Sequence, residues 1–156
     1  MLTMSAPVLA DFLHVAHHMR EDERAQWLAL TGAKAYSPDS LALAAASGSG
    51  YRWAVRDEGR AVLIGGFDEV RPGVYEAWQM STAESWARWW RSFTRISRRL
   101  IEWMVGNHAH RVQVVAQACR VQTHAWYSRS LGLTCEGRLS GYYADGTDGL
   151  MFARCA

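Results

Sequence analysis

The sequence has no long hydrophobic run and no paired cysteines. No stretch approaches the roughly 18 apolar residues that suggest a membrane-spanning helix, so we expect no membrane span. Cys119, Cys135 and Cys155 form no CxxC pair, and their odd number predicts reduced thiols in a cytoplasmic compartment. The N-terminus lacks a basic start followed by a long apolar segment, so the sequence predicts no secretory signal.

Strong charge of one sign is also missing. The formal net charge is only +2, which is too small to indicate a nucleic-acid partner. Apolar residues make up 49% and charged residues 21%, a balance typical of globular rather than disordered chains. The 156 residues are enough to bury a core, and we expect a single domain over residues 1–156.

Several familiar site motifs are absent. The sequence contains no P-loop, no Rossmann glycine motif and no Ser-His-Asp order. His17, His18, His108 and His110 have no carboxylate or cysteine at ligand spacing, so we interpret them as surface or loop histidines rather than metal ligands.

The hydrophobic pattern predicts helices first and strands afterwards. Helical spacing runs from Ala10 to Thr31 with a break near Arg20, and again from Ser40 to Ala46. The remaining predicted elements are strands at 51–56, 61–67 and 74–80, a long helix at 83–105, a strand at 111–116, a helix at 121–131, and a hairpin of 134–143 with 150–155. This order predicts an α/β fold with a mixed, mostly antiparallel sheet flanked by helices.

The centre of this arrangement is a β-α-β unit, whose two strands should lie parallel. Because that unit adjoins an antiparallel hairpin, we expect its strands to splay apart and leave a V-shaped cleft at Trp78 to Ser85.

Two segments carry a resemblance to a known family. The run His124–Leu133, HAWYSRSLGL, followed by Glu136-Gly137-Arg138, resembles the closing helix, Leu-Gly-Phe turn and strand of GNAT N-acetyltransferases. The segment Met19–Arg24 is similar to the opening helices of phage GNAT-like proteins, and the layout resembles the phage internal virion protein A family. The resemblance implies a GNAT-like fold, acetyl-CoA as donor, an amine acceptor, and a place in the host cytoplasm or the virion.

The resemblance also implies a place for the cofactor. GNAT enzymes hold the coenzyme A diphosphate at the start of the long helix through a Gln/Arg-x-x-Gly-x-Gly/Ala loop, where unpaired N–H groups and the helix dipole favour an anion. Gln79 fits the first position, whereas Thr82 and Glu84 replace the small residues. The implied cofactor-binding residues are Trp78, Gln79, Met80, Thr82, Ala83, Glu84, Ser85 and Arg88.

The same stretch has a simpler interpretation. Ser81 or Thr82 can act only as the N-cap of the helix, with Glu84 or Ser85 in its first turn. Because Thr82 and Glu84 stand where small residues are expected, we predict weak or absent binding of acetyl-CoA.

Amine acetylation needs a base and an acid. Glu76, in the middle of a predicted strand, is our candidate base, and its alternative is an outward-facing strand residue. Two residues compete as the acid. When the sequence is aligned with the family pattern on Leu131-Gly132, Ser128 falls at the position of the family's acid. Placing Tyr127 at that position needs one extra residue before Gly132. A one-residue shift turns a helical side chain by about 100°, so only one of them can face the thiol.

The pattern of the long predicted helix indicates a surface for protein contacts. Arginines lie along one side and aromatic residues along another. Trp89 and Trp90 diverge by about 100°, so we predict that one of them is exposed and contacts a second copy or another protein through the Trp86–Arg95 region. Two functions stay open: an acetyl-CoA-dependent N-acetyltransferase, or a catalytically degenerate GNAT-fold module that acts by protein contacts in phage assembly or host takeover.

Overall fold

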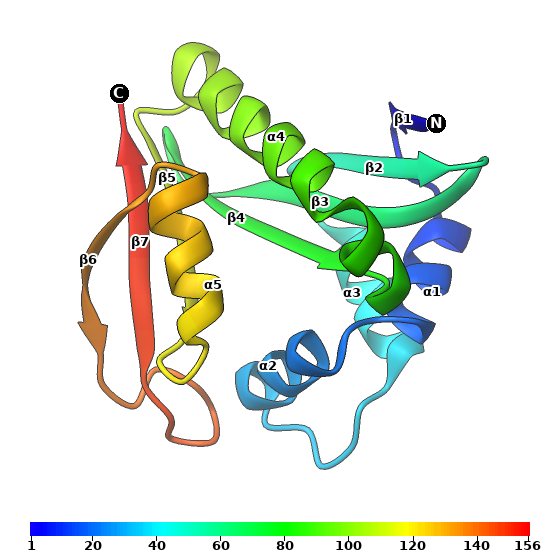
Figure 1. Cartoon of the computed structure of the whole chain (residues 1–156). Coiled ribbons are helices and arrows are strands. Elements are labelled where there is room, and N and C mark those ends of the chain that lie inside the picture. Colours follow the sequence, from blue (N-terminus) through cyan, green and yellow to red (C-terminus); the bar gives the residue numbers. More distant parts are fainter.

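A computed structural model describes residues 1–156 and contains one seven-stranded sheet (Figure 1). The strand order is β1-β2-β3-β4-β5-β7-β6, and only the β4–β5 pair is parallel. The strands are β1 (Leu2–Ser5), β2 (Tyr51–Asp57), β3 (Arg60–Arg71), β4 (Val74–Ser81), β5 (Arg111–Gln117), β6 (Thr134–Leu139) and β7 (Gly149–Cys155). The predicted mixed, mostly antiparallel fold with a central β-α-β unit is confirmed.

The helices begin and end close to their predicted limits. They are α1 (Leu9–His17), α2 (Glu21–Thr31), α3 (Pro38–Ser47), α4 (Ala83–Asn107), α5 (Val121–Ala125) and the π-helical turn η1 (Trp126–Ser130). The predicted break near Arg20 is confirmed, because this residue has extended backbone angles between α1 and α2. At the start of α3, the Ser37 hydroxyl accepts a hydrogen bond from the Ser40 N–H and Pro38 occupies the first turn.

Two features of the sheet differ from the prediction. The edge strand β1 was not predicted, because its four mostly exposed residues carry no alternating pattern. Strand β6 ends at Leu139 rather than Tyr143. The Asp148 carboxylate accepts a hydrogen bond from the Gly141 N–H at 2.8 Å, and Gly141 has a positive φ of 60°, so the chain turns there instead of extending.

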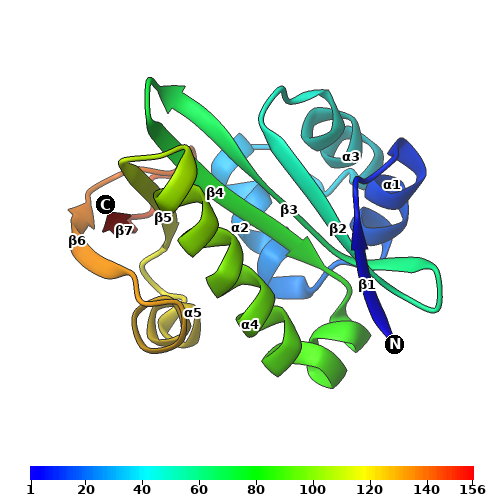
Figure 2. The ribbon, with the colours of Figure 1, turned by 90° about the horizontal axis from the view of Figure 1, so that it is seen from above.

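Helices cover both faces of the sheet (Figure 2). Helices α1 and α3 pack on one face, where Phe12 and Val15 belong to the same buried cluster as Ile64. Helix α4 and the α5–η1 segment cover the other face, where Phe93 and Met104 pack in a second cluster. Helix α2 covers neither face fully; it lies beside the far ends of β4 and β5 (Figure 1). The two cores therefore hold β4 from opposite sides, while Ala29 of α2 packs against Val115 of β5 in a third, smaller cluster.

Candidate active site

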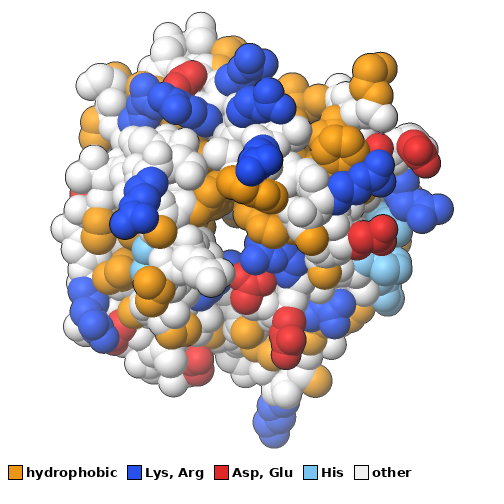
Figure 3. Space-filling model, viewed as in Figure 1, with side chains coloured by type: hydrophobic (Ala, Val, Ile, Leu, Met, Phe, Trp, Pro, Cys, Tyr) orange, Lys and Arg blue, Asp and Glu red, His pale blue; other side chains and the backbone are white.

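The parallel strands β4 and β5 pair at one end only. Residues 74–76 pair with residues 111–113, and beyond Glu76 the two strands separate, which confirms the predicted splay. The gap contains a cavity of about 920 Å³. In Figure 3 this cavity opens on the surface, with hydrophobic side chains along one rim and basic and acidic side chains along the other. Beyond Glu76, the edge of β4 that faces β5 has no strand partner, so it can receive an extended ligand.

Glu76 is the last residue of β4 that pairs with β5, and its side chain lines this cavity. It is half-buried rather than turned out to solvent. Burial raises the pKa of the Glu76 carboxyl group above its ordinary value; a hydrogen bond with Gln113 opposes this shift, and the nearby Asp68 carboxylate adds to it. A carboxyl group with a raised pKa holds a proton more readily, as a general base near neutral pH requires.

Tyr127 also lines the cavity, and Ser128 does not. The Ser128 hydroxyl is exposed and donates to the carbonyls of His124 and Ala125 in its own helix, at 3.0 and 3.4 Å. Burial raises the pKa of Tyr127 to about 12, so its hydroxyl remains protonated at neutral pH and can donate a proton. Of the two candidate acids, only Tyr127 shares a cavity with Glu76.

A π-helical turn explains why Tyr127, and not Ser128, lines the cavity. The Leu131 N–H donates to the Trp126 carbonyl five residues earlier, at 3.1 Å, instead of four residues earlier as in an α-helix. One residue is therefore accommodated within the turn, which corresponds to the extra residue that alignment on Tyr127 requires. Such single π turns occur frequently at functional sites.

Three of the predicted cofactor-binding residues line the cavity: Trp78, Gln79 and Met80. The Trp78 indole N–H donates to the Asp68 carboxylate at 2.9 Å, and the Gln79 side-chain carbonyl accepts from the Ser97 hydroxyl at 3.2 Å. These bonds fix the orientation of both side chains beside the open edge of β4.

Comparisons with known proteins identify the architecture. No protein-family model matches the sequence, and no curated protein matches it. Among solved structures, an N-acetyltransferase from Staphylococcus aureus Mu50 has a TM-score of 0.75 and 11% identity, covering 99% of this chain and 98% of that chain. A ribosomal-protein-alanine N-acetyltransferase from Brucella melitensis has a TM-score of 0.74 and 14% identity, covering 99% of both chains. A GNAT-family acetyltransferase from Streptococcus pneumoniae has a TM-score of 0.67 and 14% identity, also covering 99% of both chains. The chain has the GNAT fold.

The other predicted cofactor-binding residues of this GNAT fold lie outside the cavity, at the start of α4: Thr82, Ala83, Glu84, Ser85 and Arg88. Thr82 is the N-cap, and its hydroxyl accepts a hydrogen bond from the Ser85 N–H at 3.3 Å. The Thr82 N–H donates to the Val62 carbonyl and the Ala83 N–H to the His18 carbonyl, both at 3.1 Å.

The preceding N–H group is occupied as well. The Ser81 N–H donates to the Glu23 carboxylate at 3.0 Å, and the Ser81 hydroxyl donates to the same group at 3.2 Å. From Ser81 to Ser85, only the Glu84 N–H has no partner within the chain. A diphosphate needs several free N–H groups at a helix start. The start of α4 therefore does not fit the diphosphate of coenzyme A.

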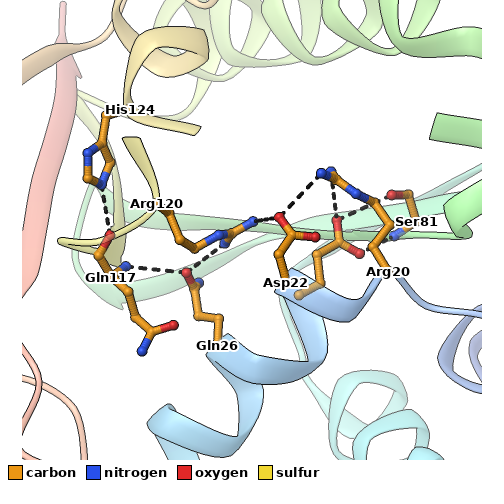
Figure 4. Close-up of polar contacts among 8 residues, drawn as sticks. Arg20, Asp22, Gln26, Ser81, Gln117, Arg120 and His124 are labelled. Atoms are coloured by element: carbon orange, nitrogen blue, oxygen red, sulfur yellow. Dashed lines mark hydrogen bonds and ion pairs between the residues drawn. The ribbon is translucent and has the colours of Figure 1, made fainter. Parts of the chain in front are cut away.

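A polar network ties α2 to both sides of the splay (Figure 4). On the β4 side, Glu23 holds Ser81. On the β5 side, the Arg120 guanidinium donates to Asp22 at 2.8 Å and to Gln26 at 2.6 Å. Gln26 also accepts from the Gln117 N–H at 3.4 Å. Helix α2 therefore bridges the two diverging strands where a donor's diphosphate would be expected.

The side chains in the first turns of α4 point in two directions. Arg88 lies 3.4 Å from the Asp57 carboxylate and stacks on Trp89, away from the cavity, so it is not placed to contact a ligand there. Trp86 and Trp90 line the cavity instead. The prediction that one of the adjacent tryptophans is exposed is confirmed, because Trp90 is 44% exposed and Trp89 is half-buried.

Sequence reasoning missed the α2 network. The charged run at 20–24 interrupts the apolar pattern, but nothing in it indicates a bond between Glu23 and a residue 58 positions away. No helix of the structure has the combination of length and apolar character needed to cross a membrane.

Proposed function

We propose that the chain is an amine N-acyltransferase that works in the splay cavity. The observation that carries the proposal is the presence of Glu76 and Tyr127, with their raised pKa values, in one cavity at the β4–β5 splay of a GNAT fold. The solved structures with this architecture are N-acetyltransferases, which supports the same class of reaction.

In this proposal, the amine nitrogen attacks the carbonyl carbon of a thioester. The Glu76 carboxylate accepts the proton that the nitrogen loses as the amide bond forms. The Tyr127 hydroxyl donates its proton to the sulfur that leaves when the carbon–sulfur bond breaks. The products are an amide and a thiol, and the proton held by Glu76 returns to the tyrosinate through solvent, which restores both groups.

Acetyl-CoA is the donor that the GNAT resemblance implies, but the filled N–H groups of α4 argue against recognition of its diphosphate. We therefore propose that the donor is held by its thioester arm. The open edge of β4 and the apolar side chains of Trp86, Trp90 and Trp126 suit an extended arm of this kind.

The test is amide formation from S-acetyl-pantetheine and, separately, from acetyl-CoA, with a panel of peptide, lysine and polyamine amines, followed by mass spectrometry. Tyr127→Phe should lower the rate about 100-fold, because the phenolic proton is lost. Ser128→Ala is the matched control and should retain the wild-type rate, because its hydroxyl bonds only to its own helix. No product from either donor, or full activity of Tyr127→Phe, would contradict the proposal.

A second function is supported by a specific observation. The filled start of α4 and the exposed Trp90 beside Arg91 favour a catalytically degenerate module that acts through protein contacts. If the chain is encoded by a phage, as its resemblance to internal virion proteins implies, the partner belongs to the virion or to the host cytoplasm. Absence of turnover together with capture of a defined virion protein by the wild type, but not by Trp90→Ala, would favour this function.

A further inference from the structure

Glu23 occupies the position that an anionic ligand would need at the β4–α4 junction. Its carboxylate accepts hydrogen bonds from both the N–H and the hydroxyl of Ser81, and it lies 3.7 Å from the Arg20 guanidinium. The Glu23 side chain is only 9% exposed. A main-chain N–H, a hydroxyl and a guanidinium are the donors with which proteins hold phosphate oxygens.

The surroundings of Glu23 keep its carboxylate in place. The Arg20 guanidinium stacks 4.6 Å from the centre of the Trp86 ring, and the Arg20 N–H donates to the Ser81 carbonyl at 3.3 Å. On the other side, Arg120 and Asp22 form an ion pair at 2.8 Å. Glu23 is thus a fixed part of the wall of the cavity rather than a mobile side chain.

We propose that Glu23 is an internal anion that replaces the donor's diphosphate at the β4–α4 junction and excludes nucleotide diphosphates from it. Removing the carboxylate leaves the Ser81 N–H and hydroxyl without their acceptor, next to the Arg20 guanidinium and near Arg120. Arg20 and Arg120 share the single carboxylate of Asp22, at 3.2 and 2.8 Å, so the site without Glu23 carries a net positive charge and free donors, which attract phosphate. The inference concerns ligand binding and holds whether or not the cavity catalyses acyl transfer.

The experiment is calorimetric titration, at pH 8 where the Glu23 carboxyl group is mostly ionised, of coenzyme A and of ADP into the wild type, Glu23→Ala and Glu23→Gln. The wild type should bind ADP more weakly than roughly 1 mM, and Glu23→Ala should bind both ligands at least about tenfold more tightly than the wild type does. Glu23→Gln retains the shape of the side chain and should show a smaller gain, so it carries the test if Glu23→Ala does not fold.

Two matched controls use carboxylates that do not hold Ser81. Glu21→Ala removes an exposed carboxylate from the same helix, and Glu84→Ala removes one from the start of α4; neither should improve binding. Micromolar binding of ADP, which has the diphosphate but no thioester arm, by the wild type would overturn the proposal. So would unchanged weak binding in both Glu23 variants, or an equal gain in the Glu84 variant.

Discussion

The two ends of the candidate donor site differ sharply. In the splay, β4 and β5 part after Glu76 and leave an open strand edge, an apolar wall and two titratable side chains facing one cavity. At the start of α4, only a few residues farther along, nearly every N–H group is already bonded within the chain. A helix start therefore becomes an anion site only when its N–H groups are left free, whatever the fold around it.

The largest expected effect concerns the open end of the site, at the β4–β5 splay. Glu76→Gln should lower the rate of amide formation by a factor of about 10² to 10⁴, because the general base is lost while the shape of the side chain remains. The wild-type rate should rise with pH through a midpoint above the ordinary carboxyl pKa, because burial raises the pKa of Glu76.

The measurement is a pH–rate profile with S-acetyl-pantetheine as donor. A midpoint at the ordinary carboxyl pKa, or an active Glu76→Gln with an unchanged profile, would assign the base to another group.

The next effect concerns the closed end of the site, at the start of α4, where Glu23 bonds to Ser81. Burial raises the pKa of Glu23 from 4.5 to about 7 in the folded protein. The folded state therefore binds this proton more tightly than the unfolded state. The resulting stabilisation is fully present below about pH 4.5 and is lost as the pH rises through 7, by roughly 3 kcal/mol in all.

Glu23→Gln removes this titration. Relative to the wild type, its free energy of unfolding should therefore increase between pH 5 and pH 8, and urea unfolding of both proteins across that range measures the difference. Parallel pH dependences in the two proteins would show that Glu23 is not held as a buried carboxylate.

A smaller effect distinguishes Glu23 from Thr82 and Glu84, the residues that the sequence alone suggested as the obstacle to binding of acetyl-CoA. The double substitution Thr82→Gly with Glu84→Gly should not tighten binding of coenzyme A, because the N–H groups of Thr82 and Ala83 are bonded to backbone carbonyls. It should cost roughly 0.5–2 kcal/mol of stability, because the N-cap hydroxyl and its bond to the Ser85 N–H are lost. Calorimetry and urea unfolding check both statements. Tighter binding of coenzyme A would show that Thr82 and Glu84, rather than Glu23 in α2, prevent recognition of its diphosphate.

The smallest effect concerns the adjacent tryptophans of α4, Trp89 and Trp90. Trp90→Ala should change the free energy of unfolding by less than about 1 kcal/mol, whereas Trp89→Ala should cost about 2 kcal/mol or more, because Trp89 packs on the core and its indole N–H donates to Asp57 at 3.1 Å. Size-exclusion mass of the same pair tests self-association. We expect Trp90→Ala alone to weaken it, and equal masses for Trp90→Ala and wild type at high concentration would contradict a contact between copies.

The fold could be predicted from the sequence because its signals are local. The period of the apolar pattern changes from helical to alternating at Tyr51, and Ser37-Pro38 mark the start of α3 in the structure. Glu76 could be proposed for a similar reason, since a carboxylate in the middle of a strand is unusual. The short edge strand β1 carries no such pattern.

The acid and the closed end could not be predicted because they depend on tertiary structure. A π-helical turn shifts the register by one residue, so the sequence could not decide between Tyr127 and Ser128. The bond from Ser81 to Glu23 joins segments 58 residues apart, and only the folded chain brings them together. A helix start with a polar N-cap looks the same in sequence whether its N–H groups are free or filled.

One measurement compares the two ends directly: the affinity of the wild-type protein for pantetheine and for coenzyme A, which contains the same arm joined to a nucleotide diphosphate. If the open splay recognises the arm and Glu23 fills the anion site, the two dissociation constants should agree within about threefold, a difference of less than 1 kcal/mol. Binding of coenzyme A that is tenfold or more tighter than binding of pantetheine would show that the diphosphate is recognised, and would contradict the account.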